Sequence, residues 1–310
     1  MLTFWLRPAF ALRVISRFQR LVGFDRSMAL ASGALTAFVS VAILSSAVLR
    51  GLGGTDAAER IISRYGLTQS GADAVRYLFA PAGDSTAGVG SFGAVFLVIS
   101  SLSFARATQR LFEQTWDLKP LSVRNTRNGL WWILGLAGYL TITGWLYALL
   151  GSGHFGIGAS LYEAPVTAAF LVYSGWILSA KRITWRELLP FGIIAAALTA
   201  LYSVGASVYL PRLFNSYTAR YGAVGAVFAM ISALFGIMLI VVGSAAAGRE
   251  VRDELSRIRQ GLRPSEDEVR REWHGVVEHT RSRWRSARRQ LSQRHTRDGD
   301  EDGRDGNGSG

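Results

Sequence analysis

The chain of 310 residues contains no cysteine and only four histidines. Disulfide frameworks, thiolate metal sites and cysteine nucleophiles are therefore excluded. His274, Glu278 and His279 come near a zinc-protease signature, but their spacing, H-x-x-x-E-H, matches neither H-E-x-x-H nor H-x-x-E-H. The sequence predicts no metal site, no cofactor and no catalytic residues.

Charge is also missing, from six long stretches without a single Asp, Glu, Lys, Arg or His. About 20 mainly apolar residues cross a hydrocarbon core of roughly 30 Å, so each stretch is long enough to span it, the fourth only just. The predicted fold class is all-α, a polytopic membrane protein with six transmembrane helices. The predicted spans are residues 27–49, 85–105, 130–150, 164–180, 188–210 and 221–248.

Lys and Arg are scarce in every second loop, which sets the predicted orientation. With the N-terminus inside, 28 of the 34 Lys and Arg fall on the cytoplasmic side, where the positive-inside rule retains them. Both termini are therefore predicted to be cytoplasmic. Much of the net charge of +12 follows from this topology, so it is weak evidence for a nucleic-acid partner, and none is predicted.

Proline is scarce too, with seven in the chain, and none is predicted at the centre of a span. Pro165 and Pro190 are predicted in the first turns of their spans, where a missing N–H costs nothing. Pro211 is predicted at the end of span five. Short outside loops are predicted over residues 151–161 and 211–220.

The segments before and between the first spans have their own patterns. Residues 1–26 form a predicted amphipathic helix, with Phe10 and Val14 on its apolar side, that lies either in the cytoplasmic interface or on the underside of the bundle. Within the membrane domain, residues 27–248, only the outside loop 50–84 is long. It is predicted to hold short helices near Asp56 to Tyr65 and Gly71 to Phe79, and to cap the outer face.

The end of the chain is polar. Residues 249–264 are predicted to continue the sixth helix and then form a linker, and residues 298–310, rich in Gly and Asp, to be disordered. Residues 265–297 are predicted to form a basic amphipathic helix. Three readings of it compete, in this order: a helix on the anionic inner leaflet, a short coiled coil, or a nucleic-acid contact. A homo-oligomer or a cytoplasmic partner would then bind through Ser265 to Gln293.

The spans lack acids and imidazoles, although proton-coupled and sodium-coupled carriers commonly keep an ionisable residue there. They offer hydroxyls instead, among them Tyr139, Ser174 and Tyr202. These hydroxyls either form hydrogen bonds between helices or line a weakly polar path for a lipid or amphipath. A Na⁺ site made of hydroxyls and carbonyls also stays open.

Charge and tryptophan collect at the predicted cytoplasmic ends of the spans. Trp131, Trp132 and Trp185 are predicted to keep their rings in the interface with the N–H wet. Some rim arginines are candidates for binding the phosphates of anionic inner-leaflet lipids, the alternative being plain topogenic charge. The candidate contacts are Arg106, Arg110, Arg186 and Arg249.

Three segments carry a family resemblance. Residues 104–116, FARATQRLFEQTW, resemble the segment after the second span in the YihY/BrkB family of bacterial inner-membrane proteins. Residues 182–192, RITWRELLPFG, resemble the start of that family's fifth span, and Tyr221-Gly222-Ala-Val-Gly225 resembles the start of its sixth. Two departures stand out: residues 35–44 lack the usual tyrosine pair and proline, and Gly243 is followed by Ser-Ala rather than by Ala-Glu.

The resemblance implies a multi-pass protein of the bacterial cytoplasmic membrane. Some members are labelled ribonuclease BN, but no metal cluster or acid-base pair for cleaving RNA is present, so that activity, and any enzyme activity, is not expected. The resemblance to envelope-associated members favours an inner-membrane transporter or flippase-like protein for a lipid or amphipathic cell-envelope compound. The alternative is a membrane scaffold or regulator that acts through its C-terminal helix.

Overall fold

The computed structural model describes residues 8–51, 59, 62, 72–73, 75–76, 86–121, 126–150 and 156–260. The predictions for residues 265–297 and 298–310 lie outside this range. By its contacts the chain forms two compact units, one of residues 18–256 and one of residues 1–17 with 257–310. The candidate site lies in the first unit.

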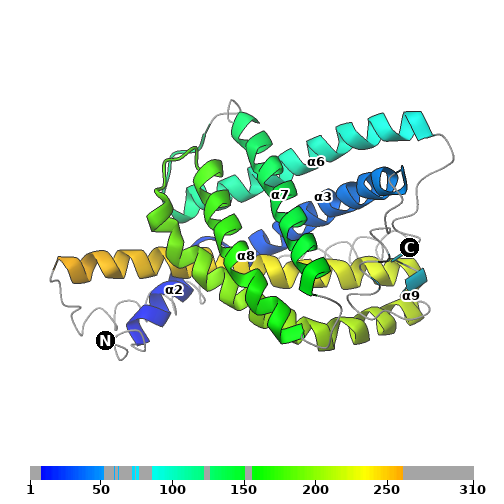
Figure 1. Ribbon diagram of the computed structural model, residues 1–310. Coiled ribbons are helices and arrows are strands. Elements are labelled where there is room, and N and C mark those ends of the chain that lie inside the picture. Colours follow the sequence, from blue (N-terminus) through cyan, green and yellow to red (C-terminus); the bar gives the residue numbers. More distant parts are fainter. Residues whose placement is uncertain are drawn as a thin grey trace, which may run out of the picture. The chain divides into compact units, whose positions relative to one another are not determined.

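Every regular element in the described part of the chain is a helix, so the all-α prediction is confirmed. Each charge-free stretch falls almost wholly on one of these helices (Figure 1). The helices are α2 (Pro8–Arg20), α3 (Gly23–Gly51), α6 (Thr86–Thr115), α7 (Thr126–Leu150), α8 (Gly156–Leu178) and α9 (Trp185–Arg259).

Three described helices are long and apolar enough to cross a membrane. They are Thr126–Leu146 in α7, and Trp185–Gly222 and Val224–Arg259 in α9, while Glu163–Leu178 in α8 is a shorter apolar helix. The length and apolar composition of these helices identify a membrane protein, because the helices of soluble proteins rarely carry apolar runs this long. The six spans and their orientation stay predictions.

A break at Gly222 divides α9 into two helices. Gly222 has φ 58° and ψ −138°, dihedrals that a residue with a Cβ rarely adopts. The predicted loop 211–220 is wrong, because this segment is helical up to the break. The loop was predicted because Arg212 and Arg220 interrupt the charge-free sequence there, but charged side chains are compatible with a helix.

Two helices also begin earlier than predicted, which changes the position of the prolines. Because α8 starts at Gly156 and α9 at Trp185, Pro165, Pro190 and Pro211 all lie inside helices. The predictions that placed Pro165 and Pro190 in first turns and Pro211 at a span end are therefore wrong, as is the loop prediction for residues 156–161. A charge-free stretch indicates which residues can lie in hydrocarbon. A helix begins at the first residue of its backbone hydrogen-bond pattern, which can lie before that stretch.

The first part of α9 packs against the described residues of the long loop 50–84. Those residues, 59, 62, 72–73 and 75–76, are helical. Val75 is fully buried in a cluster with Leu210, Phe214 and Met230. Arg76 forms ion pairs with Glu59 (2.8 Å) and Asp73 (3.1 Å), and the hydrogen bond and charge of Glu59 raise the pKa of Arg76.

At the opposite end, α3, α6 and the last part of α9 meet through Leu30, Leu111 and Val242, all nearly inaccessible to solvent. We call this the arginine end, because Arg26 of α3 and Arg110 of α6 lie within four residues of those leucines. The same end is the predicted cytoplasmic one.

A second cluster at the arginine end joins α6, α7, α8 and α9. Phe112 and Phe191 pack edge to face with ring centroids 5.4 Å apart. Trp132 is 3% exposed, and its Nε1 donates to Ser174 Oγ at 2.9 Å, so the prediction of a wet interfacial indole is wrong for this residue. The neighbouring Trp131 is 54% exposed. Consecutive helical residues point about 100° apart, so one ring faces the core and the other does not.

The predicted N-terminal helix is present as α2. It ends in a turn at Val22, whose φ is 52°, and α3 follows from Gly23. Phe18 and Phe24 meet edge to face across this turn with centroids 5.3 Å apart. Arg13 is buried, so not every arginine of α2 projects into solvent.

Candidate functional site

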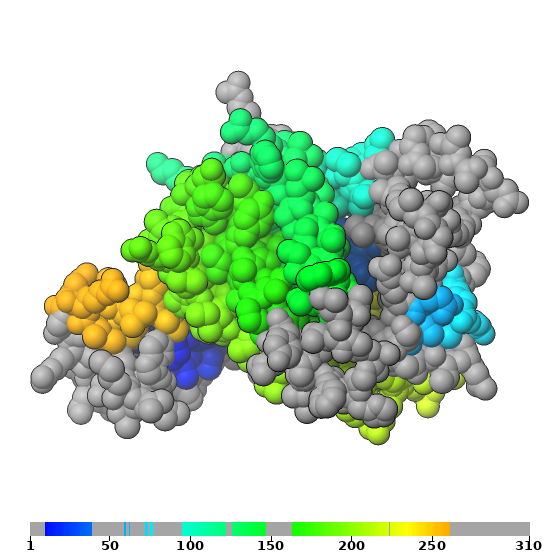
Figure 2. Space-filling model, viewed as in Figure 1, coloured from blue at the N-terminus to red at the C-terminus, as the bar shows by residue number. Residues whose placement is uncertain are grey.

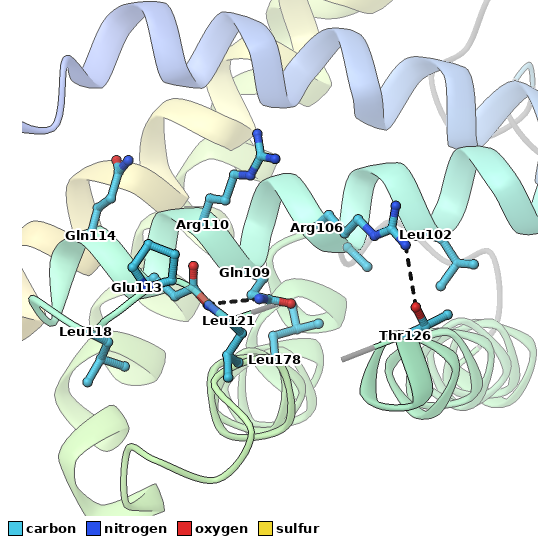
Figure 3. A pocket seen from close by; sticks show the side chains of 13 residues that line it. Leu102, Arg106, Gln109, Arg110, Glu113, Gln114, Leu118, Leu121, Thr126 and Leu178 are labelled. Atoms are coloured by element: carbon cyan, nitrogen blue, oxygen red, sulfur yellow. Dashed lines mark hydrogen bonds between the residues drawn. The ribbon is translucent and has the colours of Figure 1, made fainter. Parts of the chain in front are cut away.

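The C-terminal part of α6 presents two of the four candidate arginines on one helix face. Arg106 and Arg110 are four residues apart, and such residues lie one above the other along a helix. Both are exposed. Arg106 Nη2 lies 3.4 Å from Thr126 Oγ1 at the start of α7 (Figure 3).

A cavity of about 450 Å³ lies against these two arginines, and we call it the Arg106 cavity. It is bounded by the end of α6, the segment 116–121 and the start of α7. Its walls combine cationic, amide, carboxylate and apolar side chains (Figure 3). The lining residues are Leu102, Ala105, Arg106, Gln109, Arg110, Glu113, Gln114, Leu118, Pro120, Leu121, Thr126, Gly129 and Leu178.

Glu113 is the acid of this cavity, and one oxygen of its carboxylate accepts three hydrogen bonds. Its Oε1 accepts hydrogen bonds from Gln109 Nε2 (2.8 Å), the Leu121 amide (2.9 Å) and Arg182 Nη2 (3.2 Å). The side chain is 4% exposed. A buried carboxylate needs such donors, because an unpaired buried charge costs several kcal/mol. Glu113 therefore stabilises the wall of the cavity. Its carboxylate does not neutralise the charge of Arg106 or Arg110.

The chain turns at the end of α6 in a way that positions Glu113. Asp117 has a φ of 52°, and the Leu118 amide donates to the Glu113 carbonyl at 2.7 Å. This six-to-one hydrogen bond with a left-handed residue is how many helices end. The chain then returns alongside α6, which brings the Leu121 amide to the Glu113 carboxylate.

Arg182 fastens that returning segment to the α8–α9 connection. Besides Glu113, it donates from Nη1 to the Lys119 carbonyl (2.7 Å) and from Nε to the Ser179 carbonyl (3.0 Å). Arg182 is the first residue of the motif 182–192, but the sequence predicted no contact for it and no role for Glu113. One signal was available: Gln109 and Glu113 occur at i and i+4, on the helix face that also carries the buried Ala105 and Phe112.

The two remaining candidate arginines lie outside the Arg106 cavity. Arg186 is exposed in the first turn of α9, and its guanidinium lies 5.3 Å from the centroid of the Trp185 ring. Arg249 Nε lies 3.5 Å from Asp253 Oδ2 on the same helix. The structure therefore groups Arg106 with Arg110 and separates both from Arg186 and Arg249.

Arg26 of α3 extends the positive charge on the other side of Arg110. Its Nε is buried without a hydrogen-bond partner, and burial together with the charge of Arg110 lowers the pKa of Arg26. Arg110 projects from α6 toward α3 (Figure 3). Within the described part of the chain, neither Arg106 nor Arg110 forms an ion pair with a carboxylate. An anion with several oxygens would relieve the repulsion between the positive charges of Arg26 and Arg110.

Several hydroxyls of the apolar helices have partners within the described part of the protein, although the buried Ser244 Oγ of α9 has none. Tyr139 and Thr167 hydroxyls are 3.1 Å apart between α7 and α8, and Tyr202 donates to the Ala233 carbonyl at 2.9 Å. With the bond from Trp132 to Ser174, these contacts agree with the first reading of the hydroxyls, as bonds between helices. The described residues contain no group of three His, Asp or Glu able to hold a metal ion.

Comparison with known proteins adds one match. A family model described as "Virulence factor BrkB" matches residues 14–267. No curated protein and no solved structure matches the chain.

Proposed function

The chain belongs to the BrkB virulence factor family, and from this premise we propose that it is an inner-membrane transporter or flippase-like protein for a lipid or amphipathic cell-envelope compound. The proposal includes a multi-pass protein of the bacterial cytoplasmic membrane, with the arginine end inside and no covalent chemistry. One observation carries it: at the end of apolar helices, the Arg106 cavity holds two arginines that pair with no carboxylate of the described residues.

The chemistry of such a compound fits this cavity. A guanidinium binds phosphate or carboxylate oxygens through two parallel N–H donors, so Arg106 and Arg110 suit an anionic headgroup. Gln114 lines the same cavity, is exposed and suits neutral polar groups. The apolar surfaces of the spans suit the tail, which stays in hydrocarbon.

We expect the double substitution of Arg106 and Arg110 by Gln to slow transport of an anionic lipid at least about tenfold. A hydrogen bond to a charged group contributes roughly 1.5–3 kcal/mol, and 1.4 kcal/mol corresponds to a factor of ten. The measurement is movement of a fluorescent anionic lipid between leaflets of vesicles that contain the purified full chain. The matched control replaces Arg212 and Arg220, two exposed arginines of α9, by Gln.

Three results would count against the proposal or against this site. If the wild-type protein moves none of the envelope lipids tested, transport itself is wrong. If it does transport, and the Arg106 and Arg110 substitutions leave the rate unchanged, the Arg106 cavity is not on the route. A rate lost equally in the Arg212 and Arg220 control would indicate a general effect of charge.

The second candidate function is a scaffold or regulator acting through Ser265 to Gln293. It is favoured by the basic amphipathic pattern of that segment, which lies outside the described residues. Deleting residues 265–293 should abolish the cellular function of a scaffold and leave a transporter largely active. The measurement compares complementation by the truncated and full chains at matched membrane abundance.

A further inference from the structure

Two hollows with a common wall lie on the α7–α8–α9 face, apart from the Arg106 cavity. The first, of about 610 Å³, is formed by the start of α7 and the end of α8. The second, of about 640 Å³, runs between α8 and the start of α9. Tyr173 and Trp176 line both. The surface of α7 and α8 (green) faces the viewer in Figure 2, and no other described segment covers it there.

The first hollow is cationic. Arg127, in the first turn of α7, and Lys181, in the turn after α8, both line it and both are exposed. Lys181 Nζ lies 4.8 Å from the centroid of the Trp176 ring. Within the described residues, no carboxylate pairs with either cation. The N-terminal end of α7 adds the positive end of a helix dipole beside them.

The second hollow is apolar. Its walls include Pro165, Val172, Leu189 and Ile193. Leu189 is 38% exposed and Ile193 61% exposed, so this apolar surface is not covered by the described protein. The Tyr173 hydroxyl already has a partner, because it donates to the Trp131 carbonyl at 2.7 Å.

The length of the second hollow matches one membrane leaflet. From Pro165 to Trp176, α8 rises about 16 Å at 1.5 Å per residue. This is roughly half of a 30 Å hydrocarbon core. The cations lie at one end of this length, next to Trp176 and the exposed Trp131, which is where headgroups meet acyl chains.

We infer that this face binds one anionic phospholipid, with its phosphate at Arg127 and Lys181 and one acyl chain along α8 and α9. Charge complementarity selects the headgroup, and the apolar groove that continues from the cations selects a lipid over a soluble anion. The bound lipid is a stable component of the protein rather than its cargo. The inference is therefore independent of the proposed transport.

The test is native mass spectrometry of the purified full chain titrated with phosphatidylglycerol, and with phosphatidylethanolamine as the net-neutral lipid. Replacing Arg127 and Lys181 together by Gln is expected to weaken phosphatidylglycerol binding about tenfold or more. The matched control is Lys119→Gln, an exposed cation near the same end that lines neither hollow. It should leave binding unchanged.

The acyl chain is tested separately. Ala169, exposed in the second hollow, is replaced by Phe to fill it, and Ile193→Glu places a charge there as an independent variant. Either folded variant should also weaken phosphatidylglycerol binding, whereas inorganic phosphate at millimolar concentration should not compete.

Three results would overturn the inference. They are equal binding of the two lipids, unchanged binding after replacement of both cations, and competition by inorganic phosphate combined with unchanged binding in the groove variants. The last would leave a site for free anions instead of a lipid site. Melting temperatures within a few degrees of wild type show that a variant is folded.

Discussion

Replacing Glu113 by Ala is expected to lower the free energy of unfolding by about 2 to 4 kcal/mol. The carboxylate is buried and accepts from three donors, from Gln109, Leu121 and Arg182. Without it, the Leu121 amide loses its acceptor and the Arg182 guanidinium loses its counter-charge. The Arg182 side chain is 28% exposed, so water partly compensates for the lost carboxylate, and the cost stays below that of a fully buried charge.

The matched control is Glu187→Ala. Glu187 pairs with Arg252 at 2.7 Å, but both side chains are about a third exposed. Such a pair contributes at most about 1 kcal/mol, because solvent screens it and ordering two long side chains costs entropy. The measurement is reversible unfolding in mixed micelles followed by tryptophan fluorescence. An effect at Glu113 no larger than at Glu187 would contradict the role given to this carboxylate.

A double-mutant cycle isolates the ion pair from the other contacts of Glu113. Arg182→Ala alone should also destabilise, because it leaves a buried carboxylate without its cation and two carbonyls without their donor. The double variant should be less destabilised than the sum of the single variants, with a coupling energy of about 1 to 3 kcal/mol. Additive effects would mean that the two residues act separately.

Gly225→Ala is expected to destabilise the protein by about 3 kcal/mol or more. A Cβ at Gly225 would lie 2.1 Å from the Tyr217 carbonyl oxygen and 2.5 Å from its carbon. Both are backbone atoms, so no change of rotamer relieves the clash. The two halves of α9 would have to move apart around Gly222, whose own left-handed φ already limits how they join.

The control for this prediction is Gly205→Ala on the same helix, where a Cβ would meet no atom within 4 Å. Alanine favours a helix over glycine by about 1 kcal/mol, so this variant should be neutral or stabilised. The measurement is the melting temperature in detergent together with the yield of monodisperse protein. Equal behaviour of the two variants would contradict the close approach at Gly225.

The family resemblance and the structure agree on this turn for a physical reason. The sequence pointed to Tyr221-Gly222-Ala-Val-Gly225 only as a likeness to other chains. The structure shows what each glycine does: Gly222 supplies a positive φ, and Gly225 admits a carbonyl at close range. Neither requirement is visible in composition, so the sequence did not show that the helix continues up to the turn.

At the candidate site the sequence identified residues without their arrangement. Arg106 and Arg110 could be placed on one face because their spacing is local to a helix. Their separation from Arg186 and Arg249 could not be predicted from the sequence, because it depends on how α6 and α9 pack. Glu113 and Arg182 lie 69 positions apart, and their contact arises only when the chain turns at Asp117 and at residues 180–181.

The sequence by itself determined that this protein is built from apolar helices. Transfer of charge out of water is so costly that only charge-free stretches of this length are suited to the hydrocarbon core. The sequence also predicts the orientation through the distribution of Lys and Arg. The tertiary structure decided where the helices begin and break, which tryptophan is buried, and which charges meet. Hydropathy is a property of each residue along the chain, whereas these outcomes depend on pairs of residues that only packing brings together.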